Sequence, residues 1–278
     1  MFPRAIIFDW AGTLVDHGSM APVKAFQRLF VEYGLPITTT EARGPMGLHK
    51  REHIMRILET PAVQARFRNL HTRNPRPQDV ESLYNGFTRL QIDAIKEQCH
   101  WIPGAPEIVR AYRERGVLIG SCTGYSRRMM EPLLELAASS GVTFDSVITS
   151  CDVRHGRPSP NMIFAACRQM GIDPRKDLVI KVGDTLADVE EGFNAKVVSI
   201  GVTDTGNEMG LSYEQLIAST LDADALAKRR IKISGAMIAA RATTTIASVV
   251  ELPTVTHNQS LGRAVKNGLH LFPVAAPV

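Results

Sequence analysis

Three short apolar runs each lead into a residue that can take part in phosphate chemistry, namely Asp9, Thr123 and Asp184. A carboxylate at a strand end, followed by a turn with a glycine such as Gly12, can attack phosphorus and split one difficult displacement into two steps. An aspartate that only caps a turn would explain Asp9 equally well if this position stood alone. The hypothesis of a nucleophile therefore needs support from elsewhere in the sequence.

A pair of carboxylates further along the chain gives that support. Asp184 and Asp188 are spaced i,i+4 at an expected junction between strand and helix, so both lie on one side of the first helical turn. Together with Asp9 they would form an oxygen-rich site, which suits Mg²⁺. Asp188 has two explanations that stay open: it supports the metal ligands from behind, or it is a helix N-terminal charge stabilised by the helix dipole.

Other polar groups of the pattern suit the oxygens of a phosphate. Thr123 and Gly124 offer a hydroxyl and a backbone N–H at the end of the second apolar run, and Arg157 offers a fixed positive charge. Because Thr-Gly and Gly-Arg-Pro are common loop phrases, neither is specific alone. Their order along the chain carries the prediction.

The expected elements explain how these residues could meet. Continuous apolar runs of this length, alternating with helical patterns, are typical of buried parallel strands and predict an α/β fold. The expected strands occupy residues 5–8, 117–119, 146–148, 178–182 and 197–200, and the helical patterns between them include 105–115 and 161–170. In an open parallel sheet, ligands bind outside the carboxyl ends of the strands, where the three polar residues would all lie.

A long helical stretch separates the first strand from the second. Residues 20–99 show apolar residues such as Phe26 at helical spacing. This stretch is too long for a simple strand–helix–strand crossover, so we expect a helical cap inserted into a core of residues 1–19 and 100–253. Residues 254–278 lack a clear period, and we expect an irregular tail there.

Composition and charge exclude several classes of function. The chain has 278 residues, 44% of them hydrophobic and 22% charged, with a net charge of +4. It contains no Lys/Arg block that could track a nucleic acid, and no apolar run of the roughly 18 residues that a membrane span needs. The segment before Asp9 is too short for a signal peptide. Four cysteines without a C-x-x-C pair favour free thiols in a reducing cytoplasm.

The order of strand-end Asp, strand-end Thr, basic residue and Gly-Asp-x-x-x-Asp resembles the motifs of the haloacid dehalogenase superfamily. The resemblance covers the chain from residue 4 to about 205. It implies a Rossmann-like core with a parallel sheet and an inserted helical cap. It also implies that Asp9 is the nucleophile and that Mg²⁺ is held by the Asp9 carboxylate, the Ala11 carbonyl and Asp184. Thr123 and Arg157 would bind phosphoryl oxygens.

One position departs from most phosphatases of that superfamily. They carry a second Asp two residues after the nucleophile, which protonates the leaving alcohol, whereas this chain has Ala11. A general acid of this kind contributes roughly 10²–10⁴-fold in rate. The phrase Asp9-Trp10-Ala11-Gly12-Thr13 instead resembles the phosphonoacetaldehyde hydrolases (phosphonatases), which cleave a carbon–phosphorus bond.

The cap region supports this narrower resemblance. Residues 45–53, Pro-Met-Gly-Leu-His-Lys-Arg-Glu-His, are similar to the family's cap segment. The match implies that Lys50 forms a Schiff base with the substrate aldehyde, with His53 nearby to lower its pKa or relay protons. Substrate contacts from Met46 and Tyr125 are implied as well. Without the resemblance, the residues around Lys50 would indicate a solvent-exposed helix face.

The resemblance therefore implies hydrolysis of phosphonoacetaldehyde to acetaldehyde and inorganic phosphate, through a Lys50 Schiff base and an Asp9 aspartyl phosphate. Family members are typically homodimers that act on this small phosphonate. A phosphomonoesterase is the alternative, which Ala11 disfavours, and a non-catalytic phospho-aspartate switch is disfavoured by the long insertion. A dinucleotide-binding module would need a G-x-G-x-x-G after the first strand.

Three positions depart from the family pattern. The chain has Cys151, Asn161 and Lys196 where we expect Asp, Trp and Gly. These differences bear on catalytic efficiency and packing, and none of them falls in a core motif.

Overall fold

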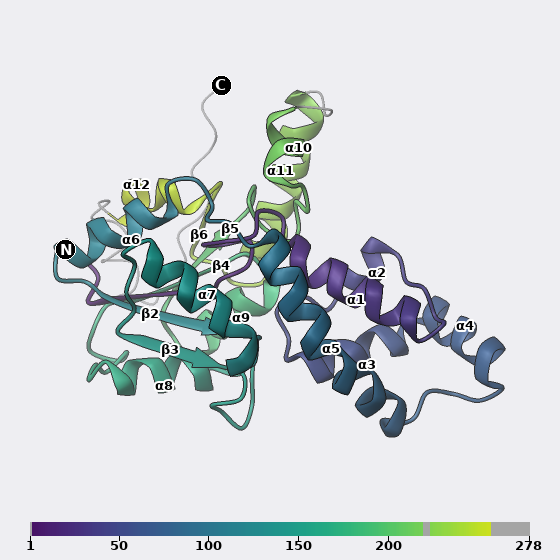
Figure 1. Cartoon of the computed structure of the whole chain (residues 1–278). Coiled ribbons are helices and arrows are strands. Elements are labelled where there is room, and N and C mark those ends of the chain that lie inside the picture. Colours follow the sequence, from purple (N-terminus) through teal and green to yellow (C-terminus); the bar gives the residue numbers. More distant parts are fainter. Residues whose placement is uncertain (1, 219–222, 257–278) are drawn as a thin grey trace.

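A parallel sheet forms the centre of the molecule (Figure 1). The computed structural model describes residues 2–218 and 223–256, and in these residues the sheet has six strands. They are β1 (Ala5–Phe8), β2 (Leu118–Thr123), β3 (Ser146–Thr149), β4 (Val179–Gly183), β5 (Val198–Val202) and β6 (Thr244–Ile246). Their order across the sheet is β3-β2-β1-β4-β5-β6. The order reverses beside β1, which confirms the predicted Rossmann-like α/β core and marks the place where such sheets bind ligands.

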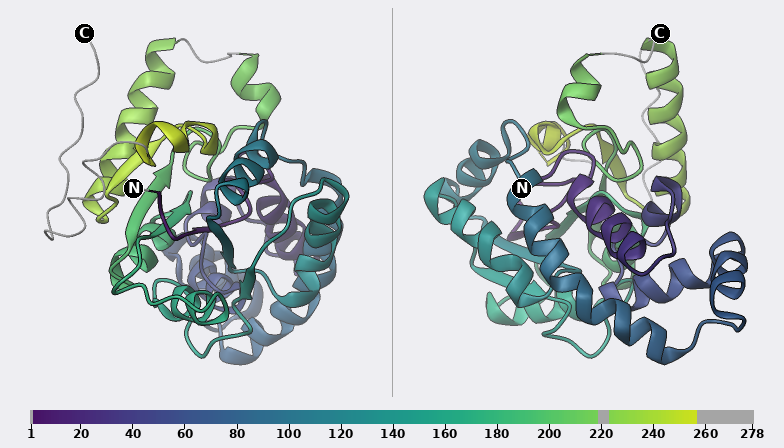
Figure 2. Two further views of the ribbon diagram at one scale, coloured as in Figure 1. Left: turned by 90° about the vertical axis from the view of Figure 1, so that its left-hand side faces the viewer. Right: turned by 45° about the vertical axis from the view of Figure 1, so that its right-hand side comes forward.

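Helices cover both faces of the sheet (Figure 2). Because successive strand residues point to opposite faces, Ile6 and Phe8 pack under one layer and Ile7 under the other. The first layer consists of α6 (Ala105–Glu114), α7 (Arg127–Ser139), the 3-10 helix η1 (Val249–Glu251) and α12 (Leu252–Thr256). The second consists of α8 (Asn161–Gln169), α9 (Leu186–Asn194) and α11 (Ala223–Ala239), with the short α10 (Tyr213–Ile217) before α11.

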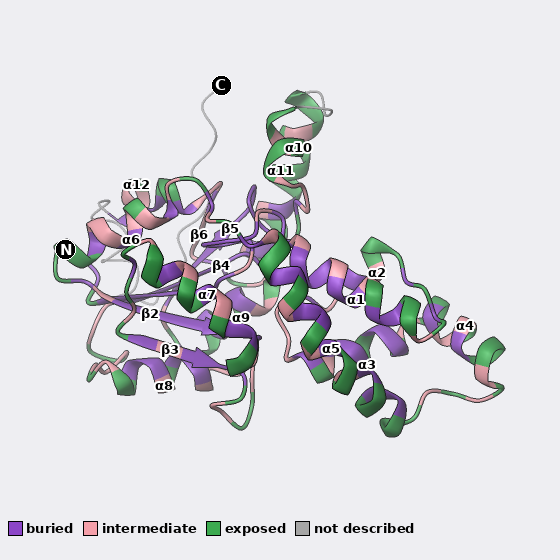
Figure 3. Cartoon of the chain, viewed as in Figure 1, coloured by how far each residue is buried: buried purple, intermediate pink, exposed green. Residues whose placement is uncertain are grey.

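The residues between β1 and α6 form a bundle of helices beside the sheet, which we call the cap (Figure 1). Its helices are α1 (Met20–Glu32), α2 (Thr39–Arg43), α3 (Lys50–Glu59), α4 (Pro61–His71) and α5 (Pro77–Gln98). α1 packs along α5, where the rings of Phe26 and Phe87 stack with their centroids 4.3 Å apart. The buried side of each helix faces the bundle or the core (Figure 3), and the apolar residues of cap and core form one continuous cluster.

Two chain segments join the cap to the core, and they lie side by side. The backbone N–H of Asp16 in the first segment donates to the carbonyl of His100 in the second at 2.9 Å. Asp16, Gly18 and Ser19 have φ angles of 56°, 78° and 50°. Such left-handed conformations turn the chain sharply, so residues 16–19 form a compact joint before α1, which we call the hinge.

Two elements differ from the expectation from sequence. The sequence does not predict β6, because a Thr-Thr-Ile edge strand has no apolar run to mark it. The expected irregular tail does not begin at residue 254, since α12 continues to Thr256, whose hydroxyl lies 2.5 Å from that of Tyr112. Residues 257–278 lie outside the described residues. All four cysteines lie within the described part and are free, as expected. No helix of that part is long and apolar enough to cross a membrane.

The three departures from the family pattern have different structural settings. Cys151 is exposed, and Asn161 is the first residue of α8. Lys196 has a φ of 58°, a left-handed conformation that is unfavourable for any residue with a Cβ. The backbone therefore explains why a glycine is expected at this position.

Replacing Lys196 by glycine should stabilise the protein by about 0.5–1 kcal/mol, because glycine adopts a positive φ without strain. Lys176→Gly is the matched control, since Lys176 is also an exposed turn residue but is absent from the positive-φ positions. Thermal unfolding should show a midpoint about 1–4 °C higher for Lys196→Gly and a lower one for Lys176→Gly. A midpoint for Lys196→Gly at or below that of the wild type would contradict this explanation.

Candidate active site

The parallel register brings Asp9 and Asp184 together at the carboxyl edge of the sheet. Phe8 pairs with Val182, and the Asp9 N–H donates to the Val182 carbonyl at 2.9 Å, so the residues that follow β1 and β4 are neighbours. Thr123 ends β2, on the other side of β1. All three strand-end residues are buried. They meet at the switch point of the sheet, as the strand pattern indicates.

Donors from distant parts of the chain orient Asp184. The Ser19 hydroxyl donates to its Oδ2 at 3.1 Å, and the backbone N–H of Asn207 donates to the same oxygen at 2.7 Å. Gly12 leaves room for the carboxylate, since a Cβ at this position would lie 2.1 Å from Oδ2. Burial raises the pKa of Asp184 well above its usual value, and neighbouring carboxylates raise it further.

Arg157 is the central cation of the site. Its side chain is 1% exposed, and Nη2 donates to Asp9 Oδ1 at 2.8 Å and to the Cys122 carbonyl at 2.6 Å. Its Nε donates to Glu191 Oε2 at 3.0 Å, and Nη2 lies 3.0 Å from Asp188 Oδ1. Burial opposes the charged form, but the surrounding carboxylates hold the pKa of Arg157 well above its usual value.

Lys181 and Glu191 belong to the same network, although the sequence analysis does not single them out. Lys181 Nζ lies 2.8 Å from Asp188 Oδ1 and 3.6 Å from Glu191 Oε2, and both residues are fully buried. The signal that could have found them is a lysine inside an apolar strand run, because a buried ammonium needs a carboxylate partner. Glu191 lies three residues after Asp188, on the same side of α9.

Asp188 is a helix N-terminal charge, as one of its two explanations predicts, and it also forms ion pairs inside the site. Its carboxylate accepts from the backbone N–H and the hydroxyl of Thr185, and its own N–H donates to Thr185 Oγ1, so the pair forms a capping box at the start of α9. Its Oδ1 faces Arg157 and Lys181. Burial alone would raise the pKa of Asp188, but the charges of the two cations outweigh it and lower the pKa.

The site is rich in negative charge. Oxygens of Asp9, Asp184 and Asp188 lie within 4.8 Å of one another, and the carboxylates of the network outnumber its cations. Burial raises the pKa of Asp9 although Arg157 lies beside it. Buried carboxylates held this close favour a bound cation, and oxygen donors suit a hard divalent one. These residues could therefore hold a metal ion.

The cap contributes a buried lysine. Lys50 is the first residue of α3 and is 4% exposed, so it does not lie on the solvent-exposed face of this helix. Its Nζ lies 5.1 Å from the ring centroid of Tyr125 and 5.5 Å from that of Phe26. No carboxylate of the described residues lies within ion-pair distance of Lys50. Burial lowers the pKa of Lys50 to about 8, with a contribution from the charge of Arg157. The positive end of the helix dipole acts in the same direction.

His53 lies one helical turn after Lys50 and is fully buried. Its Nε2 is 2.9 Å from the Ala42 carbonyl, and since a carbonyl only accepts, Nε2 carries the proton. Nδ1 is then an unprotonated nitrogen, buried without a partner among the described residues. Burial and the charge of Lys50 lower the pKa of His53 well below its usual value, so the ring is neutral. A neutral ring adds no charge beside Lys50, so the lowered pKa of Lys50 is caused by burial and by Arg157.

A small cavity lies between the cap and the strand ends. Its volume is about 20 Å³, roughly the room for one water molecule. Apart from His53 and Asp188, which lie outside it, all the expected site residues line the cavity: Asp9, Ala11, Met46, Lys50, Thr123, Gly124, Tyr125, Arg157 and Asp184. The cap must therefore open before a substrate can enter.

Two glycines allow the cap to lie directly on the core. A Cβ at Gly124 would be 2.9 Å from the Leu48 carbonyl oxygen. Gly47 has a φ of 89°, and a Cβ there would be 2.5 Å from Thr185 Oγ1. The hydroxyl of Tyr125, which lines the same cavity, is buried without a partner among the described residues. The close contacts at Gly47 and Gly124 hold the cap against the core beside this cavity. The Tyr125 hydroxyl is a hydrogen-bond donor that these contacts leave unpaired.

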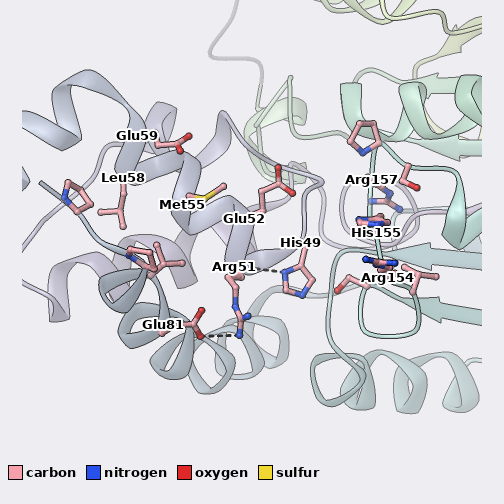
Figure 4. Close-up of a pocket in the computed structure, with 18 of the residues that line it drawn as sticks. His49, Arg51, Glu52, Met55, Leu58, Glu59, Glu81, Arg154, His155 and Arg157 are labelled. Atoms are coloured by element: carbon pink, nitrogen blue, oxygen red, sulfur yellow. Dashed lines mark hydrogen bonds and ion pairs between the residues drawn. The ribbon is translucent and has the colours of Figure 1, made fainter.

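A larger cleft of about 1200 Å³ opens between the cap and the core (Figure 4). Arg51 and Met55 of α3 lie on one wall, and Arg154 and His155 lie on the other. Arg157 lines both the cleft and the smaller cavity. The cleft therefore borders the buried site at Arg157.

Known proteins share this sequence and architecture. The family model for haloacid dehalogenase-like hydrolases matches residues 3–196. A phosphonoacetaldehyde hydrolase of Hahella chejuensis is 45% identical over 77% of this chain and 73% of its own length. Another, from Pseudomonas fluorescens, is 38% identical over 91% of this chain and 90% of its own length. The crystal structure of a phosphonoacetaldehyde hydrolase like protein from Oleispira antarctica matches with a TM-score of 0.89, 33% identity and 98% coverage of both chains. The chain belongs to the haloacid dehalogenase-like hydrolases and, within them, to the phosphonoacetaldehyde hydrolase family.

Proposed function

We propose that the protein hydrolyses the carbon–phosphorus bond of phosphonoacetaldehyde to give acetaldehyde and inorganic phosphate. The observation that carries this proposal is the buried amine of Lys50, which lines the same small cavity as the carboxylate of Asp9. An amine forms an imine with an aldehyde, and a carboxylate can accept a phosphoryl group. The names of the relatives support the same substrate.

Lys50 prepares the bond for cleavage. A free carbanion is a poor leaving group, whereas an iminium beside the breaking bond turns it into an enamine. The amine must be neutral to condense, and an ordinary lysine is neutral in fewer than about one case in a thousand at pH 7. Because the pKa of Lys50 is lowered to about 8, roughly one in ten Lys50 side chains is neutral at pH 7. His53 is suited to relay a proton during condensation, because its Nδ1 can accept one.

Asp9 then takes the phosphoryl group. Its carboxylate attacks phosphorus, the carbon–phosphorus bond breaks, and the electron pair passes into the iminium to give the enamine. Protonation of the enamine carbon and hydrolysis of the imine release acetaldehyde and restore Lys50. A water molecule cleaves the aspartyl phosphate, which releases phosphate and restores Asp9. Arg157 binds Oδ1 of Asp9 and so leaves its other oxygen for the attack.

Ala11 fits this leaving group. A carbon leaving group that departs as an enamine needs no proton donor at the breaking bond, so the acid expected in an ester-cleaving relative is dispensable. Position 11 places only a methyl side chain at the cavity wall. A phosphomonoesterase, the alternative function, would lack its general acid here.

We further propose that the metal is Mg²⁺, held by the Asp9 carboxylate, the Ala11 carbonyl and Asp184. The bound ion would neutralise charge on the transferring group. Asp188 would support the ligands through Arg157 and Lys181. The substrate contacts would come from Met46, Thr123, Gly124, Tyr125 and Arg157.

Three further features stay predictions. One is the division into a core of residues 1–19 and 100–253 and a cap of residues 20–99, which the adjacent crossings at the hinge support. Another is the cytoplasmic location, which the free cysteines support. The third is the homodimer that the family resemblance implies.

Removal of the metal should abolish turnover. In excess chelator, phosphate release from phosphonoacetaldehyde should fall to background, because the buried carboxylates then lose the charge that balances them. Addition of Mg²⁺ in excess over the chelator should restore the rate. A protein that keeps full activity in excess chelator would have no metal role for Asp9 and Asp184.

Lys50 should be the residue that forms the imine. Borohydride added with acetaldehyde should inactivate the protein and leave a reduced adduct on Lys50, detected by peptide mass spectrometry, whereas borohydride alone should do much less. Lys50→Arg keeps the charge but stays protonated, so it should lose carbon–phosphorus cleavage by several orders of magnitude while still folding. Lys96→Arg, an exposed position on α5, is the matched control. Normal cleavage by Lys50→Arg, or an adduct on another lysine, would refute the assignment.

The reaction should follow the titration of Lys50. Only the neutral amine condenses, so kcat/KM should rise with pH as the ammonium loses its proton and level off above a midpoint of about 8. An ordinary lysine would give a rise that continues to about pH 10. Steady-state rates from pH 6 to 10 separate these outcomes, and a continued rise would show that burial does not lower this pKa.

A further inference from the structure

We propose that Arg43 is a positioning residue that couples closure of the cap to the orientation of Asp184. The inference rests on the proposed function, because it takes Asp184 to be a metal ligand and the cap to open and close. Arg43 is the last residue of α2 and therefore belongs to the cap (Figure 1). Its guanidinium, however, binds the core.

The contacts of Arg43 cross from the cap to two other segments. Nη1 donates to the Gly18 carbonyl of the hinge at 2.6 Å, and to the carbonyl and side-chain oxygens of Asn207 at 3.1 and 3.0 Å. Nη2 donates to the Gly210 carbonyl at 3.3 Å. No carboxylate of the described residues lies within ion-pair distance of Arg43. Its charge is therefore satisfied by oxygens of the hinge and of residues 206–211, which we call the 206–211 loop.

The 206–211 loop reaches Asp184 through the residue that Arg43 binds. The Asn207 N–H donates to Asp184 Oδ2 at 2.7 Å. A Cβ at Gly206 would lie 2.7 Å from Asp184 Cβ, so the loop backbone rests directly on this side chain. Asn207 thus contacts Arg43 with its two oxygens and Asp184 with its nitrogen. If Arg43 moves away with the cap, Asn207 loses the contacts that fix it, and Asp184 loses a fixed donor.

The loop is shaped to receive the guanidinium. Gly210 has a φ of 61°, and a Cβ there would lie 2.9 Å from Arg43 Cζ. At Gly18 in the hinge, a Cβ would lie 2.3 Å from the Leu211 carbonyl oxygen. Glycine at both positions lets hinge, loop and guanidinium pack together. This fit distinguishes Arg43 from an arginine that merely lies on the surface.

On the cap side, α2 also holds a group of the proposed mechanism. The carbonyl of Ala42, next to Arg43 in the chain, is 2.9 Å from His53 Nε2. An ion pair of 2.7 Å between Arg66 and Glu41 ties α2 to α4. Arg43 therefore lies between Asp184 on the core and His53 on the cap. Its bonds align the two halves of the site when the cap is closed.

Binding of Mn²⁺, which accepts the same oxygen ligands as Mg²⁺, tests the inference without turnover. Metal-free protein is titrated with Mn²⁺ alone, and the free ion is measured by electron paramagnetic resonance. Arg43→Met should weaken binding by about 10- to 100-fold, the usual effect of losing a group that orients metal ligands. Arg43→Lys should be intermediate, since one ammonium cannot span Asn207 and Gly210 as a guanidinium does. Arg28→Met, at an exposed arginine of α1 paired with Glu97, is the matched control and should bind Mn²⁺ like the wild type.

Asn207→Ala gives a second test that does not require Arg43→Met to fold. It removes the side-chain oxygen that Arg43 binds and keeps the N–H that binds Asp184. If Arg43 acts through Asn207, the losses of Mn²⁺ affinity in the two single variants should not add in the double variant. Thermal unfolding without metal identifies any variant that has lost its fold.

Three outcomes would overturn the inference. The first is a folded Arg43→Met variant that binds Mn²⁺ as tightly as the wild type. The second is a pair of losses for Arg43→Met and Asn207→Ala that simply add. The third is a wild type that binds no Mn²⁺, which would refute the proposed metal role and the inference with it. In the first two cases the wild type still binds Mn²⁺, so the results refute the role of Arg43 without contradicting the proposed function.

Discussion

Buried negative charge at the carboxyl edge of the sheet is the constraint on which the rest of the structure depends. Parallel register forces Asp9 and Asp184 to be neighbours, and burial makes their charged forms unfavourable. Two buried cations balance part of this charge: the guanidinium of Arg157 and the ammonium of Lys181, which lies inside an apolar strand. These cations leave an excess of negative charge, which a divalent ion would balance so that a negatively charged phosphoryl group could then bind. The site is thus held ready for both before either arrives.

The cap supplies the other half of the chemistry through the same physical effect. Burial that penalises a carboxylate's charge also penalises an ammonium's charge, and it makes the amine of Lys50 neutral more often. An opened cap would return Lys50 to water and raise its pKa, so imine formation belongs to the closed state. Several features stabilise the state in which the cap lies on the core: the small cavity between them, the close contacts at Gly47 and Gly124, and the hydrogen bonds of Arg43.

The sequence predicts what local pattern determines. The strand ends and the helical insertion follow from apolar runs, and the roles of Asp9 and Lys50 are those that the family resemblance implies. β6 could not be predicted, because its pairing with β5 is a tertiary contact that leaves no local pattern in the sequence. The partners of Arg43 could not be predicted for the same reason, since carbonyl oxygens of Gly18 and Gly210 have no signature in sequence. The neutral ring of His53 depends on burial, which only the folded structure reveals.

The central claim is that the buried amine serves a carbon leaving group, and the most direct test compares two substrates of the wild type. Phosphonoacetaldehyde and glycolaldehyde phosphate carry the same aldehyde and phosphoryl group, but an ester oxygen separates carbon from phosphorus in the second. Because Ala11 provides no general acid for an alkoxide, kcat/KM for phosphate release should be about 10²-fold or more higher with phosphonoacetaldehyde. Equal or faster release from glycolaldehyde phosphate would contradict the account and identify the protein as a phosphomonoesterase.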